Sequence, residues 1–161
     1  MKTILRNKRA ISPVIATVIL VAVAISVAVA VAYWMGGIAG MYTKFEKIEI
    51  QSAYAAKTSG TPDVWNITMG LKNTGSADAT LTHAYVNNVP TTSIGIEWWY
   101  DAGAGKVVVP ASGLNIVSGR QVTVYLMIES TDGNGFSSGQ TLNIKLHSAG
   151  GMDYIKLVEL T

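Results

Sequence analysis

The sequence predicts an α+β chain, in which a long N-terminal hydrophobic α-helix is followed by an all-β, Ig-like sandwich domain. First, residues 10–43 carry no charged side chain and are almost entirely apolar. Second, residues 52–161 consist of short alternating stretches separated by turns rich in Gly, Asn and Asp, which is typical of antiparallel sandwiches. Third, cysteine is absent, which excludes a disulfide framework and a thiolate metal site. We therefore divide the chain into segments 1–10, 11–51 and 52–161.

Charge is distributed unevenly along the chain. Of the twelve basic residues, four stand in the first nine positions; they are Lys2, Arg6, Lys8 and Arg9. The remaining eight face ten acidic residues, so the rest of the chain has a net charge of −2, and no acidic residue precedes Glu46. This distribution indicates a targeting segment followed by a mildly acidic domain, and it argues against a nucleic-acid partner.

Residues 10–43 are long enough to cross a membrane as a helix. At ~1.5 Å per residue they would extend over about 50 Å, whereas the hydrocarbon core of a bilayer is ~30 Å thick. The run is longer than the ~7–15 apolar residues of a cleavable secretory signal. "VAVAISVAVAVAYW" (residues 21–34) alternates like a strand, but both members of the alternation are apolar. Because only a helix satisfies its own backbone within one membrane segment, we predict a helix that starts with Ser12 as N-cap and Pro13.

The predicted helix is apolar on all sides, since its alanines and valines are spread around it. Such a helix is buried either by lipid, as a lone anchor, or by several protein neighbours; the pattern leaves both readings open. Gly36 and Gly37 could mark a bend, and residues 44–50 could remain helical. The residues expected in the core of a helix bundle are Pro13, Val14, Val18, Val21, Ile25, Ala28, Val29, Ala32 and Trp34.

The start of the chain resembles the class III signal of archaeal type IV pilins. The resemblance lies in the basic leader, the junction Lys8, Arg9 and Ala10, and the sequence "ISPVIATVILVAVA" that begins at Ile11. It implies that a prepilin peptidase cuts between Ala10 and Ile11 and leaves the apolar helix on the mature chain. The implied precursor lies in the cytoplasmic membrane, and the mature chain forms the helical core of an extracellular, cell-surface filament decorated by the sandwich domain.

The same resemblance implies the partners of the chain. They are further copies of itself in a helical homopolymer, membrane lipid before assembly, the prepilin peptidase, an assembly ATPase and a membrane platform protein. Bacterial type IV pilins usually carry glutamate at the fifth mature position, where this chain has Ile15, which favours the archaeal branch. "SPVIAT" is more typical of adhesive pilins than of archaellins, so adhesion is the implied role. The alternatives are an archaellin of a motility filament, or a membrane-anchored binding module with an uncleaved helix that recognises sugars through Trp98 and Trp99.

The predicted sandwich has seven to eight strands. The segments that suggest them begin at "VWNITMGLKN" (64–73) and end with "DYIKLVEL" (153–160), which we expect to close a sheet. Alternation places a set of apolar side chains in the core. They are Val122, Val124, Leu126 and Ile128 in one strand, and Leu142, Ile144 and Leu146 in another.

The sequence contains little that suggests catalysis. It has no "GxSxG" nucleophile motif and no "GxxxxGK[ST]" phosphate loop, and His83 and His147 are far apart along the chain. "TDGNG" (131–135) lacks the glutamate that completes a calcium loop, so we interpret it as an ordinary turn. We therefore expect no enzymatic activity, no cofactor and no metal site.

Two surface features suggest binding or modification. Trp98 and Tyr100 would point to one side of a strand and Trp99 to the other, so at least one aromatic is expected in a surface or inter-subunit contact. The alternative places Trp99 in the core and the other two at its rim. Asn66 begins the single Asn-x-Ser/Thr sequon of the chain, "NIT", and is a candidate N-glycosylation site.

Overall fold

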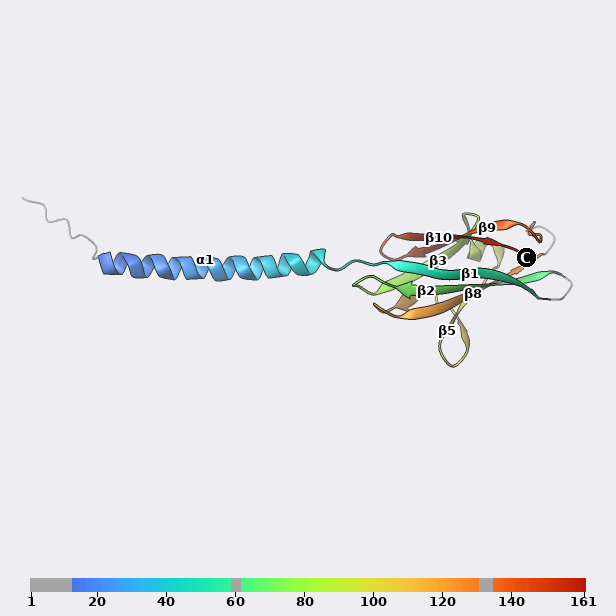
Figure 1. Cartoon of the computed structure of the whole chain (residues 1–161), viewed down its shortest axis with the longest axis horizontal. Coiled ribbons are helices and arrows are strands. Elements are labelled where there is room, and N and C mark those ends of the chain that lie inside the picture. Colours follow the sequence, from blue (N-terminus) through green and yellow to red (C-terminus); the bar gives the residue numbers. More distant parts are fainter. Residues whose placement is uncertain (1–12, 59–61, 131–134) are drawn as a thin grey trace, which may run out of the picture. The chain divides into compact units, whose positions relative to one another are not determined.

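The computed structural model describes residues 13–58, 62–130 and 135–161. The chain divides into two compact units, Met1–Thr43 and Lys44–Thr161. In the first unit the structure describes one helix, and in the second it describes ten strands and a short 3-10 helix (Figure 1). The α+β class and the β-sandwich are confirmed. The proposed cleavage junction of Lys8, Arg9, Ala10 and Ile11 lies outside the described residues.

Helix α1 (Pro13–Tyr42) contains 30 residues. Pro13 is the first residue that the structure describes, so the predicted N-cap Ser12 lies outside the described residues. The helix runs without interruption through Gly36 and Gly37, so the bend that these glycines suggested is not present. The two hydroxyl groups within its apolar part are satisfied by the helix itself. The hydroxyl of Thr17 donates a hydrogen bond to the carbonyl of Val14, and that of Ser26 to the carbonyl of Ala22, each at 2.8 Å.

The predicted helical segment 11–51 is too long at its C-terminal end. The helix ends at Tyr42, and strand β1 begins at Ile48, within that segment. The reason is a tertiary contact, because the carbonyl of Lys47 accepts hydrogen bonds from the amides of Thr74 (2.8 Å) and Gly75 (3.2 Å). A backbone that pairs in this way with a distant turn cannot also close α-helical hydrogen bonds.

The ten strands form two antiparallel sheets. Their order is β1-β2-β8-β5-β6 in the first sheet and β10-β9-β3-β4 in the second, where β7 also pairs with β3. The bounds are β1 Ile48–Thr58, β2 Val64–Asn73, β3 Ala79–Val86, β4 Val89–Pro90, β5 Trp98–Asp101, β6 Lys106–Val108, β7 Leu114–Ile116, β8 Gln121–Glu129, β9 Thr141–Ser148 and β10 Asp153–Glu159. The 3-10 helix η1 spans Thr91–Ile94. The seven to eight predicted strands did not include β1 or β4.

The core lies between the two sheets and follows the predicted alternation. Val124, Leu126 and Ile128 of β8 are fully buried, and Val122 packs against them half-buried. Leu142, Ile144 and Leu146 of β9 are also fully buried, as predicted. Each strand thus buries one face, and the opposite face is free to carry polar or functional side chains.

The last strand lies at the edge of the second sheet. β10 pairs with β9 along its whole length, which confirms that "DYIKLVEL" completes a sheet. The Tyr154 hydroxyl lies 3.4 Å from the Glu46 carboxylate, and the Thr161 hydroxyl donates to the carbonyl of Ala55 at 3.3 Å. Burial raises the pKa of Tyr154, and the charge of Glu46 adds to this effect. These contacts tie the end of the chain to the start of the domain.

A buried asparagine organises the turn after β2. Asn73 is fully buried, and its amide nitrogen donates to the carbonyls of Ala77 and Ile116, both at 2.8 Å. Its side-chain oxygen accepts a hydrogen bond from the amide of Gly75 at 2.9 Å. The backbone approaches so closely here that a Cβ atom on Gly75 would lie 2.5 Å from the carbonyl oxygen of Phe45. One side chain therefore joins β2, the following turn and β7.

Candidate functional site

Helix α1 exposes apolar side chains on every side. None of its residues is buried within the chain; the exposed fraction is 68% for Val14 and 67% for Trp34. An 18-residue stretch of the helix has a mean hydropathy of 3.0, and the length and composition of the helix fit a membrane span. At ~1.5 Å per residue the 30 residues extend over about 45 Å, more than the ~30 Å of a hydrocarbon core. All the predicted bundle-core residues, from Pro13 to Trp34, lie on this helix.

The small residues of α1 occupy two opposite sides of the helix. From Val21 to Ala32, the even-numbered positions carry Ala or Ser, and the odd-numbered positions carry Val or Ile. At about 100° per residue, successive small residues are about 200° apart, so they alternate between opposite sides. Small side chains allow helices to approach closely. The helix can therefore receive close neighbours on two sides at once.

The three aromatic residues of β5 are divided between the two faces of the first sheet. Trp98 pairs with Leu126 of β8 and points into the core, where only 8% of it is exposed. Tyr100 is half-buried and packs against the same core. Trp99 lies on the outer face and is half-buried. Trp98 therefore lies in the core, which contradicts its prediction as a surface contact. The alternative that put Trp99 in the core is wrong as well.

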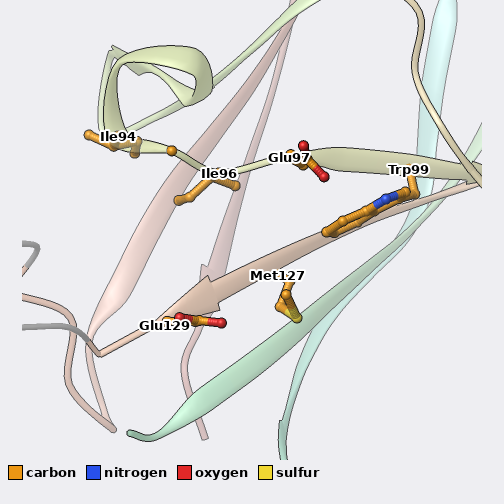
Figure 2. A pocket seen from close by; sticks show the side chains of 7 residues that line it. Ile94, Ile96, Glu97, Trp99, Met127 and Glu129 are labelled. Atoms are coloured by element: carbon orange, nitrogen blue, oxygen red, sulfur yellow. The ribbon is translucent and has the colours of Figure 1, made fainter.

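Trp99 borders two open pockets on the outer face of the first sheet. The first has a volume of about 260 Å³ and is shown in Figure 2; its lining residues are Ile94, Gly95, Ile96, Glu97, Trp99, Met127 and Glu129. The second, also about 260 Å³, is lined by Asn66, Trp99, Lys106, Tyr125 and Met127. Both pockets thus share Trp99 and Met127. Sequence reasoning found the tryptophan but missed its polar neighbours, which come from other strands.

The sequon residue Asn66 lies on the outer face near the start of β2. Its side chain is half-buried, and its amide nitrogen donates to the hydroxyl of Thr58 on β1 at 2.8 Å. It also lines the second pocket beside Trp99. The sequon is therefore on a face that a glycan could reach, and glycosylation of Asn66 stays a prediction.

The two histidines are brought together by pairing of β3 with β9. The ring centroids of His83 and His147 are 6.5 Å apart, and the Nδ1 of His147 lies 2.6 Å from a carboxylate oxygen of Asp153. The hydrogen bond from His147 lowers the pKa of Asp153, and Lys145, whose Nζ lies at 3.8 Å, lowers it further. Within the described ranges there is no group of three or more His, Cys, Asp or Glu residues that could hold a metal ion.

Replacing Asp153 with Asn should reduce the acid sensitivity of the fold. The pKa of Asp153 is lower in the folded than in the unfolded chain, so its stabilising effect is complete above the ordinary carboxyl range and disappears as the pH falls through the lowered pKa. The unfolding temperature of the full chain should therefore fall less in the variant between about pH 6 and about pH 2. Glu159→Gln, on the same strand, is the control and should behave like the unmodified chain. Equal pH slopes for Asp153→Asn and the unmodified chain would contradict the stabilising role of this pair.

Comparisons with known proteins find several similar solved structures. No family model matches the chain, and no curated protein matches its sequence. One similar structure is the archaellum periplasmic stator protein FlaG from Sulfolobus acidocaldarius, with 14% identity, a TM-score of 0.38, and coverage of 70% of this chain and 99% of that chain. Another is the archaeal flagellum of Methanospirillum hungatei strain JF1, with 16% identity, a TM-score of 0.43, and coverage of 92% of this chain and 89% of that chain. At these values the likeness concerns the fold alone and says nothing of what the chain does.

Proposed function

We propose that the chain is the structural subunit of an extracellular archaeal filament of the type IV pilus class, polymerised through α1. The observation that carries this proposal is a 30-residue helix that is apolar on every side and buries none of its residues within its own chain. Exposed apolar surface of this extent requires either lipid or further protein around it. A filament core made of such helices supplies the protein surroundings.

The composition of α1 favours assembly over a lone anchor. Moving the helix from lipid into a bundle removes no apolar surface from water, so the gain must come from close packing. The alternation of small with β-branched residues places small side chains on two opposite sides, where neighbouring helices can approach. A lone anchor needs only about 20 apolar residues and no such pattern.

The leader and the assembly machinery belong to the same proposal. Residues 1–10 are the leader peptide that a prepilin peptidase removes. Ile11 then becomes the N-terminus of a subunit that remains in the cytoplasmic membrane until assembly. The sequence contains no phosphate loop, so the energy for extraction comes from a separate assembly ATPase acting through a platform protein. The subunit itself has no enzymatic role, and adhesion is the role that the resemblance implies for the filament.

Intact-mass measurement of the native protein tests the proposal. Filaments sheared from cells should contain a chain that lacks residues 1–10 and begins with Ile11, and a glycan on Asn66 would add a discrete mass to it. The membrane precursor in cells without the peptidase should keep Met1 and form no filaments. A native protein that keeps its leader, or that is found only as a membrane-bound monomer, would favour the anchored binding module instead.

A further inference from the structure

We propose that Trp99 and the polar side chains around it form a carbohydrate-binding site for the pyranose rings of an oligosaccharide from outside the chain. All the residues that line the site belong to the sandwich domain, so this inference goes beyond the proposed filament and does not depend on polymerisation. The inference assigns an oligosaccharide ligand to the sandwich domain.

Trp99 supplies the apolar platform of the site. Its neighbours Trp98 and Tyr100 turn to the core, so the strand alternation leaves this one indole on the outer face. Met127 of β8 lies beside it, and both line the two pockets. A pyranose ring has an apolar face of C–H groups, and covering it with an aromatic ring removes apolar surface from water on both partners.

Hydrogen-bonding groups of both kinds surround this platform. In the first pocket the acceptors are the carboxylates of Glu97 and Glu129 (Figure 2), and neither forms an ion pair or a side-chain hydrogen bond within the described part of the chain. The second pocket contributes the amide of Asn66, the ammonium group of Lys106 and the hydroxyl of Tyr125. A sugar, whose hydroxyl groups both donate and accept, can use donors and acceptors together.

The two pockets differ in charge. Glu97 and Glu129 line the first, and Lys106, whose Nζ lies 3.9 Å from the ring centre of Tyr125 next to Trp99, lines the second. A ligand that occupies both pockets therefore meets carboxylates in one and an ammonium group in the other, which matches neither a purely cationic nor a purely anionic ligand. A neutral, polyhydroxylated ring can be accepted by both pockets, because its hydroxyl groups need no net charge in the site.

The size of the pockets agrees with one sugar ring in each. Each holds about 260 Å³, slightly less than the ~300–1,000 Å³ of pockets that accept drug-sized molecules. Since the two pockets meet at Trp99 and Met127, two consecutive rings of one oligosaccharide could occupy them. Met127, Tyr125 and Glu129 project from the same face of β8, so the strand geometry holds this arrangement in place.

Ligand-observed saturation-transfer NMR on the full chain tests the site. The protein is produced in a host without N-glycosylation and kept in a detergent without a sugar headgroup, because glycosidic detergents would compete. The probes are the methyl glycosides of glucose, galactose, mannose and N-acetylglucosamine, and a trisaccharide of whichever binds. We expect saturation transfer to at least one probe, tighter binding of its trisaccharide, and a loss of affinity of about tenfold or more in Trp99→Ala. Trp99→Phe should retain part of the binding, since a smaller platform remains.

Matched variants separate this site from other causes of binding. Tyr54→Ala removes an exposed aromatic from β1 outside both pockets and should bind like the unmodified chain. Absence of transfer to all four glycosides, or equal binding by Trp99→Ala, would overturn the proposal. Binding of tetramethylammonium that is lost in the Glu97→Gln, Glu129→Gln double variant would identify a cation site instead. Native protein that carries a glycan on Asn66 and no longer binds the probes would show that the chain's own glycan fills the pockets, which also overturns an external ligand.

Discussion

Replacing Ala28 with Phe is expected to abolish filament assembly and to leave the β-sandwich folded. Ala28 belongs to the small-residue alternation of α1, and its surroundings within the chain are empty, so the isolated subunit has room for a phenyl ring. In a close-packed bundle the same ring would clash, and overpacking costs about 1–3 kcal/mol for each site that must accommodate it. Because every subunit in a filament repeats the clash, the effect accumulates along the assembly. Electron microscopy of sheared cell-surface material would show whether filaments are present.

Two further variants make this experiment decisive. Ala30→Phe lies on the opposite side of the helix, about 200° away, and should also prevent assembly. Ile25→Leu, in the same alternation, changes the shape of the side chain but keeps its volume, and should assemble almost normally. The circular dichroism of all three purified chains should match that of the unmodified chain. Normal filaments from both phenylalanine variants would show that α1 has no close neighbours, and the lone lipid-surrounded anchor would then be the better description.

The helix could be predicted because its physical cause is local. Each backbone group of a single apolar segment in a membrane must find its hydrogen bond within that segment, and an uncharged run of this length achieves this as a helix. Its end could not be predicted in the same way. The charged segment after Tyr42 is compatible with a helix by composition. Its backbone instead forms hydrogen bonds with the turn after β2, from the amide of Thr74 to the carbonyl of Lys47 and from the amide of Ala77 to the carbonyl of Phe45.

The outer-face site could be predicted only in part, for a related reason. Three consecutive aromatic residues give no alternation from which the buried face could be chosen, and the pairing of Trp98 with Leu126 decides it. The residues around Trp99 come from β2, β6 and β8, and the order of these strands in the sheet is not encoded in any local pattern. The approach of His83 to His147 is likewise a result of β3–β9 pairing.

Replacing Asn73 with Ala should destabilise the β-sandwich by about 3–5 kcal/mol, a large share of the ~5–15 kcal/mol that stabilises a typical domain. The substitution removes the side-chain partner of the buried carbonyl of Ile116 and of the part-buried carbonyl of Ala77. It also removes one of the two acceptors of the Gly75 amide, which keeps its hydrogen bond to the carbonyl of Lys47 at 3.2 Å. Each buried group that loses its hydrogen bond costs about 1–3 kcal/mol. Denaturant titration of the full chain, followed by the fluorescence of the buried Trp65 and Trp98, measures the change in the free energy of unfolding.

The nature of the Asn73 side chain matters as much as its size. Asn73→Asp preserves the shape but cannot donate to the two carbonyls, and it places a negative charge against them, so it should destabilise the domain at neutral pH at least as much as alanine does. Asn115→Ala, at an exposed position of the adjacent strand β7, is the matched control and should change stability by less than about 0.5 kcal/mol. If Asn73→Ala were as stable as Asn115→Ala, the turn would be held by the backbone hydrogen bonds between Lys47 and Thr74 and not by this side chain.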